Sequence, residues 1–513
     1  MTKQIRNLGF FLVVIYAALF LQVNRLTFFE AEELQDNPAN NRAIRRDFDA
    51  PRGSITTADG VLIADSVETG PDGRFERQRR YQAPQLYAHV TGYYGFSVGA
   101  AGLEDAYNEE LAGRTLDLDL QDIGDLFVDR ERVGNLTLTI RDDVQRVAQA
   151  ALGDREGSVV ALDPRTGGIY AMYSFPSFDP NLLSSHDLGA AATEDARLNE
   201  DPENPKLSRV FQQRFFPGST FKVVTASAGV ERAGVTPNEP VYPQADSYQA
   251  TPGGRPLRNF GGRQCGGPLF VILQQSCNSA FAEMGVEQVG GQGMVDTAEA
   301  FGFNDDDTPF DLGDVATSEF PDSVEGPDGE AQPLDQNRGI LAQLSIGQNG
   351  VSATPLQMAM VAAGVANDGR VMAPYVVQEV RDDQDEVVDE TDPDEWRTAV
   401  STSTAATMQD AMASVVDEGS AIRLDDQGLE DCNVGGKTGT AQLGTDPPRS
   451  HAWIIGYAGC EGGVPEVAVA VIVEGQEGAS EQTGGEVAAP IAGSVLSQVV
   501  GRSGNAPAND SGD

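Results

Sequence analysis

The stretch that most constrains this chain is residues 216–222, which read Phe-Pro-Gly-Ser-Thr-Phe-Lys. A Pro-Gly pair favours a turn, and the next ten residues hold no helix breaker, so the pattern predicts a helix that begins near Ser219. A serine in the first helical turn keeps its backbone N–H unpaired, and a lysine three residues later lies on the same face. Ser219 and Lys222 are therefore a candidate nucleophile and a candidate base.

A Ser-x-x-Lys pair on its own is more simply interpreted as an N-cap serine followed by a solvated lysine. Two further motifs follow this pair along the chain: Ser276-Cys277-Asn278 and Lys437-Thr438-Gly439-Thr440. The Ser-x-Asn tripeptide carries little information alone, whereas Lys-Thr-Gly-Thr in a strand is more specific. The ordered triplet, rather than any one member, indicates a single catalytic site.

The first two motifs supply proton-transfer groups if they converge with the third. A lysine with an ordinary pKa near 10.4 is protonated at neutral pH and is a poor base. Burial and a second ammonium group, that of Lys437, would lower the pKa of Lys222. Lys222 would then take the proton of Ser219, directly or through a relay. Ser276 offers a hydroxyl that passes a proton to a leaving amine.

The Ser-x-Asn motif also offers a hydrogen-bonding amide. In an extended loop Ser276 and Asn278 point to one side and Cys277 points to the other. We therefore expect the Asn278 amide to hold an amide group of the substrate.

The Lys-Thr-Gly-Thr strand is predicted to bind the substrate. Lys437 and Thr438 would bind a carboxylate, and Gly439 would leave room for a substrate to lie along the strand edge. The backbone N–H groups of Ser219 and Thr440 would form an oxyanion hole.

The sequence does not indicate a metal, a cofactor or a nucleic-acid partner. The three histidines, His89, His186 and His451, are far apart and lack ligand spacing, which argues against zinc and against a Ser-His-Asp site. The net charge of −43 comes from 78 acidic and 35 basic residues. Such an acidic balance argues against nucleic acid as a partner.

The N-terminus predicts a membrane anchor. Lys3 and Arg6 precede residues 8–23, an apolar run in which Gln22 is the only polar side chain. The run is slightly short for a spanning helix, which needs about 20 residues. A cleaved signal peptide is the alternative, but no small-x-small site directly follows the run, which favours an uncleaved anchor. The preceding positive charges predict a cytoplasmic N-terminus and an extracytoplasmic remainder.

A chain of 513 residues should hold two or three domains. The predicted divisions are a cytoplasmic tip and transmembrane anchor over 1–30, a pedestal over 45–150, a catalytic domain over 155–500 and a disordered tail over 501–513. A polar linker is predicted over 37–46. The pedestal begins with a hairpin signal, because an Asp-Gly turn at 59–60 separates two strand patterns. Its arginine and glycine at 52–53 can be no more than turn residues.

Local patterns predict the main elements of the catalytic domain. Strands are predicted over 158–163, 169–173 and 467–473, a hairpin over 433–442 and 451–459, and a closing helix over 485–499. The acidic segment 382–395 is predicted to be a solvated excursion.

The motif triplet resembles that of class B penicillin-binding proteins, which are membrane-anchored peptidoglycan D,D-transpeptidases. The resemblance covers nearly the whole chain. It extends to Arg-Gly-x-Ile-x-x-x-Asp-Gly at 52–60, Gly-Leu-Glu…Tyr-Asn at 102–108 and Thr-Pro-Leu-Gln-Met-Ala at 354–359. It implies an α+β architecture in which a mixed α/β pedestal of the dimerisation type carries a serine β-lactamase-like transpeptidase domain. That domain would combine an antiparallel sheet flanked by helices with an all-helical subdomain.

The resemblance also implies an activity and partners. Ser219 would be acylated by the penultimate D-Ala of a peptidoglycan stem peptide, D-Ala would leave, and an amine of a neighbouring stem would resolve the acyl-enzyme. β-Lactams would acylate the same serine, and a SEDS-family glycosyltransferase is the expected membrane partner. Residues 347–350 read Gly-Gln-Asn-Gly where the family usually has Gly-Gln-Gly, and Asn349 tolerates the positive φ that this requires.

Two other functions stay open at this point. A D,D-carboxypeptidase or β-lactamase would resolve the acyl-enzyme with water, but the anchor and the pedestal argue against both. A non-catalytic penicillin sensor would keep the fold, but the intact motifs argue against it. The region before the catalytic domain is too short for a glycosyltransferase domain. A role in elongation or in division is not distinguished by the sequence.

Four cysteines allow three disulfide connectivities, and four buried free thiols are the alternative. If 433–442 and 451–459 form a hairpin centred near position 446, Cys432 and Cys460 face each other across its open end. The remaining pair, Cys265 and Cys277, would pin the Ser276–Asn278 loop from behind. We therefore predict the pairs 265–277 and 432–460.

Overall fold

The computed structural model describes residues 2–24, 48–70, 74–115, 133–326, 329–424, 428–446, 448–476 and 482–503. The linker predicted over 37–46 and the part of the predicted tail after residue 503 lie outside the described residues.

The N-terminal segment is a single helix, α1 (Thr2–Asn24). Its stretch Lys3–Gln22 is long and apolar enough to cross a membrane, and none of it is buried against the rest of the protein. An apolar helix that no protein surface covers fits the predicted membrane anchor.

An antiparallel sheet forms the centre of the catalytic domain. Its strands, in spatial order, are β19 (Asn433–Gln442), β20 (Ser450–Gly459), β21 (Val467–Val473), β7 (Gly157–Leu162) and β8 (Ile169–Phe175). Asn433 pairs with Gly459 and Gln442 with Ser450, which is the register of the predicted hairpin. β20 and β21 are buried along their whole length, because helices cover both faces of the sheet.

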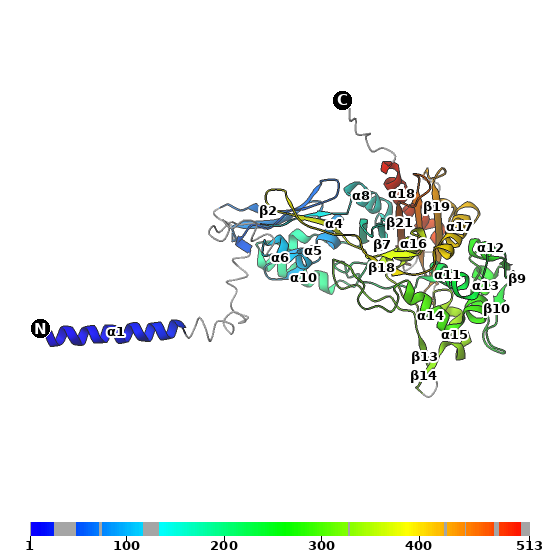
Figure 1. Ribbon diagram of the computed structural model, residues 1–513, viewed down its shortest axis with the longest axis horizontal. Coiled ribbons are helices and arrows are strands. Elements are labelled where there is room, and N and C mark those ends of the chain that lie inside the picture. The colour runs from blue at the N-terminus through cyan, green and yellow to red at the C-terminus, as the bar shows by residue number, and fades with distance from the viewer. Residues whose placement is uncertain are drawn as a thin grey trace, which may run out of the picture.

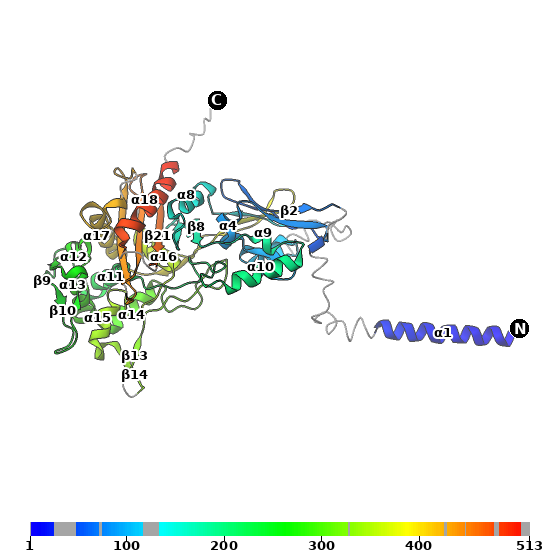
Figure 2. The same cartoon turned by 180° about the vertical axis from the view of Figure 1, so that it is seen from behind.

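Two pairs of helices cover the sheet (Figures 1 and 2). α18 (Gly484–Ser503) packs on β20 and β21 and against α8 (Asp142–Leu152), which itself packs on β8. α16 (Pro355–Ala366) packs on the same central strands and against α17 (Thr402–Glu418), which contacts β19. Because α16 and α18 cover the same strands, they lie on opposite faces of the sheet.

The closing helix runs further than predicted. α18 continues to Ser503, so the predicted start of a disordered tail at residue 501 is wrong. The cause is apolar burial, since Leu496, Val499 and Val500 pack into the core and carry the helix past the predicted end at residue 499.

The side of the catalytic domain next to β19 is mainly helical. Its helices are α11 (Lys222–Ala233), α12 (Leu269–Gln274), α13 (Asn278–Glu283), α14 (Gly290–Ala300) and α15 (Arg338–Leu344). Short strand pairs accompany them: β9 (Tyr242–Ala245) with β12 (Cys265–Gly267), β10 (Ser247–Tyr248) with β11 (Leu257–Arg258), and β13 (Ser323–Glu325) with β14 (Ala331–Pro333). The subdomain is therefore helical but not all-helical as predicted.

The pedestal is built on a mixed sheet. Its strands, in spatial order, are β17 (Val387–Glu390), β16 (Val377–Arg381), β6 (Asn135–Leu138), β1 (Ile55–Thr56), β2 (Leu62–Glu68) and β3 (Arg77–Tyr81). β1 and β2 pair antiparallel, which confirms the hairpin predicted at the Asp-Gly turn. The segment 382–395 is mostly exposed, as predicted, but it is not an irregular excursion, because residues 387–390 form β17, which pairs with β16. Val377 and Val380 are buried opposite Leu138 and Leu136, and this pairing draws the acidic segment onto the pedestal sheet.

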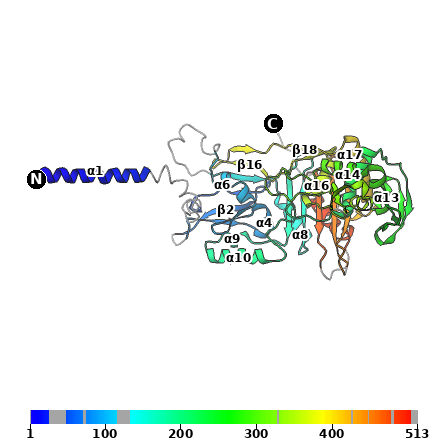
Figure 3. The same ribbon diagram turned by 90° about the horizontal axis from the view of Figure 1, so that it is seen from below.

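A second segment of the predicted catalytic range also packs on the pedestal. The pedestal elements in this region are α4 (Pro84–Thr91), β4 (Tyr93–Gly95), β5 (Gly99–Ala101), α5 (Leu103–Ala106) and α6 (Asn108–Leu111). It contains α9 (Pro180–Leu183) and α10 (Leu188–Glu200). Figure 3 shows both helices beside the pedestal strands. Asn181 Oδ1 accepts a hydrogen bond of 2.9 Å from the Tyr81 backbone N–H. The remaining strands, β15 (Arg370–Met372) and β18 (Glu395–Thr398), pair where the chain returns to the catalytic domain.

A buried ion cluster joins two stretches of the pedestal. Glu104 is fully buried and accepts 2.5 Å bonds from Arg52 Nε on one carboxylate oxygen and from Arg79 Nε on the other. Tyr81 donates its hydroxyl to the same carboxylate at 3.0 Å, and Arg52 also donates to Asn108 Oδ1 at 2.9 Å. Arg52 is therefore a structural residue rather than a turn residue.

Asp311 joins the catalytic domain to the pedestal. Its Oδ2 accepts 2.7 Å bonds from the backbone N–H groups of Val376 and Val377, where β16 begins. Burial raises the pKa of Asp311 to about 6, against an ordinary value of 3.8. The carboxyl group is therefore easier to keep neutral in the folded protein than in the unfolded chain.

This joint predicts a pH-dependent stability. Since the folded pKa is raised, protonated Asp311 favours folding at low pH, and that stabilisation is lost as pH rises through about 6. Asp311→Asn keeps an acceptor for the two N–H groups. We expect its stability relative to the wild type to rise by about 2–3 kcal/mol between roughly pH 4 and pH 7. Denaturant unfolding of both proteins at each pH measures the difference, and a constant difference would contradict the prediction.

Candidate active site

The predicted nucleophile lies on a tight turn before a helix. Helical structure begins at Gly218, close to the predicted start near Ser219, as a 3-10 turn over Gly218–Phe221 that continues directly into α11 from Lys222. Gly218 has φ of +54°, and a Cβ there would lie 3.1 Å from the Cα of Ala441 on β19. The glycine thus allows the Ser219 turn to pack directly against the edge strand of the sheet.

Lys222 brings the first two motifs together. Its side chain is fully buried, and its Nζ lies 3.0 Å from Ser219 Oγ. The same Nζ lies 2.8 Å from the Ser276 carbonyl oxygen, 3.1 Å from Ser276 Oγ and 2.6 Å from Asn278 Oδ1. The amine therefore contacts both the candidate nucleophile and the Ser-x-Asn motif.

These contacts suit an unprotonated lysine. Asn278 donates its Nδ2 to the Arg258 carbonyl oxygen at 3.1 Å, which turns its Oδ1 towards Lys222. A neutral amine has two N–H bonds, and the Ser276 carbonyl and Asn278 Oδ1 can each accept one. The lone pair is then left for the hydroxyl proton of Ser219, which is the arrangement that a general base requires.

Lys437 extends the cluster from the third motif. It is fully buried on β19, and its Nζ donates to Ser276 Oγ at 3.0 Å and to the Thr438 carbonyl oxygen at 2.7 Å. Ser276 Oγ therefore bridges Lys437 and Lys222. The three motifs meet through this one hydroxyl.

The electrostatics of the two lysines favour a neutral Lys222. Burial, the charge of Lys437 and the charge of Arg263, in that order, hold the pKa of Lys222 well below its usual range. Burial lowers the pKa of Lys437 to about 7. Two ammonium groups that share one hydroxyl cannot both be charged without strong repulsion, so one proton is lost.

The Ser276–Asn278 segment is a turn between helices and not the predicted extended loop. Ser276 has φ of +53°, and Cys277 caps α13, which begins at Asn278. Cys277 is buried in a disulfide with Cys265, with Cα atoms 5.9 Å apart. The turn and the disulfide, rather than strand alternation, direct Ser276 and Asn278 to Lys222. Cys432 and Cys460 form the second disulfide, with Cα atoms 4.2 Å apart.

The disulfide behind the motif predicts a coupled loss of stability and reactivity. We expect the double substitution Cys265→Ser and Cys277→Ser to lower the free energy of unfolding by roughly 3 kcal/mol and to slow acylation of Ser219. Unfolding curves and labelling rates measure the two effects. Non-reducing peptide mapping checks the premise, and four free thiols or a 265–432 linkage would show it to be mistaken.

The edge strand β19 forms one wall of the site. Thr438 and Thr440 line the cleft, and Ser420 Oγ lies 2.5 Å from Thr438 Oγ1. A Cβ at Gly439 would lie 3.0 Å from the Pro217 carbonyl oxygen, so this glycine lets β19 approach the Ser219 turn. The structure thus gives Gly439 a packing role that differs from the predicted substrate contact.

The departure at 347–350 causes no distortion. Asn349 has φ of +57°, the positive value that was expected. Gly347 has φ of +72°, and a Cβ there would lie 2.2 Å from the Gly218 carbonyl oxygen. This segment therefore packs directly against the turn that carries Ser219. Gln348 of the same segment lines the cleft.

The motifs open into a cleft of about 700 Å³. Sequence reasoning missed several residues that line it, among them Ser420, Arg258 and Arg263. A signal for the arginines was present, because three of the few basic residues of this acidic chain fall within 255–263. No local pattern could have placed that segment beside the cleft.

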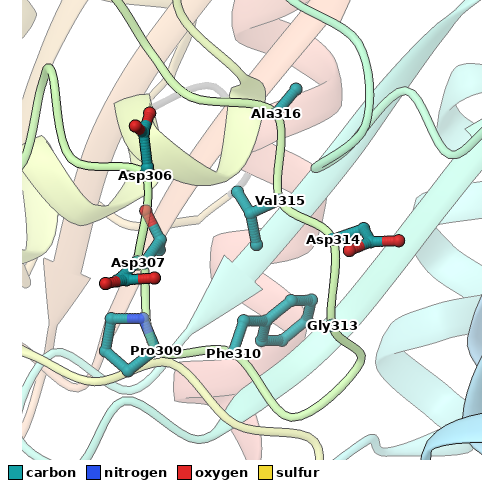
Figure 4. Close-up of a pocket in the computed structure, with 9 residues that line it drawn as sticks. Asp306, Asp307, Pro309, Phe310, Gly313, Asp314, Val315 and Ala316 are labelled. Atoms are coloured by element: carbon teal, nitrogen blue, oxygen red, sulfur yellow. The ribbon is translucent and has the colours of Figure 1, made fainter.

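A second cavity, of about 590 Å³, lies in the loop 306–316 (Figure 4). Asp306 and Asp307 lie on one side of it and Asp314 on the other, so their carboxylates do not converge. Among the described residues there is no group of three acidic, histidine or cysteine side chains that could hold a metal.

A partly buried serine on a tight turn, a buried lysine beside it and a second lysine across one hydroxyl are the groups that an active-site-serine acyl-transfer centre requires. The antiparallel sheet with helices on both faces is the matching scaffold. Residues 157–497 match the family described as the penicillin binding protein transpeptidase domain, and residues 52–136 match the penicillin binding protein A dimerisation domain. The chain belongs to the penicillin-binding protein transpeptidase family.

Relatives of similar length and architecture support this assignment. The peptidoglycan D,D-transpeptidase PbpA of Mycolicibacterium smegmatis is 38% identical over 508 residues, covering 96% of this chain and 97% of the relative. PbpA of Mycobacterium tuberculosis is 34% identical over 515 residues, covering 97% and 98%. Both relatives are named as D,D-transpeptidases.

Solved structures share the fold. Penicillin-binding protein A from M. tuberculosis, as an imipenem acyl-enzyme complex, matches with a TM-score of 0.77 and 35% identity over 88% of this chain and 99% of that chain. Its penicillin G acyl-enzyme complex matches with a TM-score of 0.76 and 35% identity over the same shares. In those proteins the fold supports a covalent adduct with β-lactams.

Proposed function

We infer that this protein is a peptidoglycan D,D-transpeptidase that cross-links stem peptides through an acyl-enzyme on Ser219. The observation that carries this proposal is the 3.0 Å contact between Ser219 Oγ and a buried Lys222 Nζ. The relatives named D,D-transpeptidases, which match nearly the whole chain, support the same reaction.

The acylation step assigns a role to each group. Lys222 takes the Ser219 proton while Oγ attacks the carbonyl carbon of the penultimate D-Ala. The developing oxyanion is bound by the backbone N–H groups of Ser219 and Thr440. Ser276 then delivers a proton to the leaving D-Ala amine, and Lys437 replenishes it through their 3.0 Å contact.

Substrate binding and deacylation use the same groups. Lys437 and Thr438 bind the terminal carboxylate, and Asn278 holds the peptide amide. An amine of a second stem peptide attacks the ester in the second step, and proton transfer runs in reverse. β-Lactams enter by the first step and stop there, as they do in the acyl-enzyme complexes of the M. tuberculosis protein.

The protein acts outside the membrane. Lys3 and Arg6 lie at the N-terminal end of the candidate span Lys3–Gln22, which favours a cytoplasmic N-terminus and an extracytoplasmic catalytic domain in a single-pass topology. A SEDS-family glycosyltransferase is the proposed partner within the membrane, on the basis of the family resemblance. Copurification of the full-length protein with such a polymerase from membranes tests this partner.

The product decides between a transferase and a hydrolase. The full-length protein is incubated with a peptide ending in D-Ala-D-Ala and increasing concentrations of an amine acceptor peptide. We expect D-Ala release to be accompanied by a cross-linked product whose share grows with the acceptor concentration. Hydrolysed peptide as the only product at saturating acceptor would favour a carboxypeptidase, and no D-Ala release at all would favour a sensor.

A further inference from the structure

The active-site cleft is basic although the protein is strongly acidic. The chain has 78 acidic and 35 basic residues. Among the described residues that line the cleft there is no aspartate or glutamate, whereas Arg258 and Arg263 both line it. Lys222 and Lys437 lie buried at its base. The composition of the cleft is thus opposite to that of the whole chain, which points to an anionic ligand.

The guanidinium groups of the two cleft arginines have no anionic partner among the described residues. In the part of the chain that the structure describes, neither guanidinium makes an ion pair, whereas arginines elsewhere do, such as Arg209 with Glu474 at 2.6 Å and Arg80 with Asp65 at 2.6 Å. Both cleft arginines are exposed. Their charges are therefore available to a ligand.

The backbone that carries these arginines is held firmly beside the reactive groups. Asn259 is 5% exposed, and its Oδ1 accepts a 2.8 Å bond from the Ser279 N–H of α13. Its Nδ2 donates to the Arg263 carbonyl oxygen at 3.0 Å, and Asn278 donates to the Arg258 carbonyl oxygen at 3.1 Å. The backbone of both arginines is therefore held in place on the helical side of the cleft, and that of Arg258 is bonded directly to Asn278.

In the proposed function, Lys437 and Thr438 bind the C-terminal carboxylate of the peptide. They lie on β19, on the side of the cleft opposite the two arginines. We propose that Arg258 and Arg263 form a separate subsite for a second carboxylate, that of an acidic residue within the stem peptide. The inference rests on the proposed function and adds to it which charge the enzyme prefers on its peptide substrate. A guanidinium binds a carboxylate through two parallel N–H bonds, and an amide in its place loses the charge and one acceptor.

Arg263 also acts on Lys222, and the test must separate this effect from binding of a carboxylate. Its charge contributes to the lowered pKa of Lys222. An arginine that acted only in this way would speed the reaction of every substrate alike. A subsite instead favours one form of the peptide over another. The decisive quantity is therefore the ratio of kcat/KM for two peptides on the same enzyme.

The experiment uses the full-length protein in detergent and two synthetic peptides ending in D-Ala-D-Ala. One peptide carries a free side-chain carboxylate before the D-Ala pair, and the other carries its primary amide. We expect the wild type to prefer the carboxylate form roughly tenfold in kcat/KM for D-Ala release. The double variant Arg258→Gln and Arg263→Gln should bring the ratio close to one. High salt should also reduce the wild-type ratio, because the arginines are exposed.

Matched variants make the outcome specific. Arg255→Gln removes the same charge from the same segment but outside the cleft lining, and it should keep the wild-type ratio. Arg258→Lys with Arg263→Lys keeps the charge and should keep part of the preference. An unchanged ratio in the double glutamine variant, with only the acid limb of its pH profile moved to higher pH, would overturn the subsite and leave the proposed function intact. If the wild type released D-Ala from neither peptide, both the subsite and the proposed function would be overturned.

Discussion

Replacement of Lys222 by arginine is expected to reduce the rate of Ser219 acylation by about a thousandfold or more. The guanidinium can still donate to the Ser276 carbonyl and to Asn278, which lie 2.8 and 2.6 Å from Nζ in the wild type, but it is always charged, whereas burial and Lys437 favour a neutral Lys222 amine. It has no lone pair for the Ser219 proton, because its pKa stays above about 12. The substitution therefore removes the base and also places a fixed positive charge beside Lys437, and both changes slow acylation.

The second-order rate constant for labelling by a fluorescent penicillin measures this effect. Lys206→Arg is the matched control, because Lys206 pairs with Asp195 at 2.6 Å on a partly buried surface away from the cleft. We expect that control to label at the wild-type rate. Near-normal labelling of the Lys222→Arg protein would remove lysine from the proton-transfer step.

Replacement of Glu104 by glutamine is expected to lower the free energy of unfolding by about 3–5 kcal/mol. The Glu104 carboxylate lies between Arg52 Nε and Arg79 Nε at 2.5 Å each, and all three side chains are at most 5% exposed. Glutamine leaves two buried guanidinium groups without a counter-charge. The loss of such a charge costs far more than the net value of the original ion pair.

Asp65→Asn is the matched control for this effect. Asp65 also pairs with an arginine, Arg80, at 2.6 Å, but the Arg80 side chain is 50% exposed. Water can replace that pairing, so we expect a loss of about 1 kcal/mol or less. Denaturant unfolding of both variants provides the comparison. A loss for Glu104→Gln no larger than that for Asp65→Asn would contradict the role assigned to the cluster.

Local sequence patterns predicted the elements whose partners are close in the chain. The hairpin of β19 and β20 follows from alternation and a short connection, and its register places Cys432 opposite Cys460. The strand β21 is a continuous apolar run, VAVAVIV, that ends where the polar residues begin. In these cases the pattern and the tertiary environment favour the same structure.

The predictions that failed depend on distant partners. The acidic segment 382–395 is mostly exposed, as its polarity predicts, but β17 within it belongs to the pedestal sheet because its neighbour β16 pairs with β6, about 240 residues earlier. Likewise, Arg52 is a turn residue by local pattern, and only the meeting with Glu104 gives it a buried partner. Contacts between residues so far apart in the chain leave no local periodicity in the sequence from which they could be predicted.

The candidate site shows the same division. The motif triplet identified the residues that meet at Lys222, because each motif carries its own chemistry. The geometry of the Ser276–Asn278 turn was not predictable, since Ser276 adopts a positive φ that serine rarely takes. The arginines at 258 and 263 were not predicted either, because their position beside the cleft depends on the bonds of Asn259 to α13 and β9.

The central claim is that Ser219 is the residue that becomes acylated, and intact-protein mass spectrometry after exposure to penicillin tests it most directly. We predict that the full-length wild type gains the mass of one penicillin, that peptide mapping places it on the fragment containing Ser219, and that Ser219→Ala gains nothing. A covalent adduct of unchanged yield on the Ser219→Ala protein, or an adduct mapped to Ser276, would contradict the account.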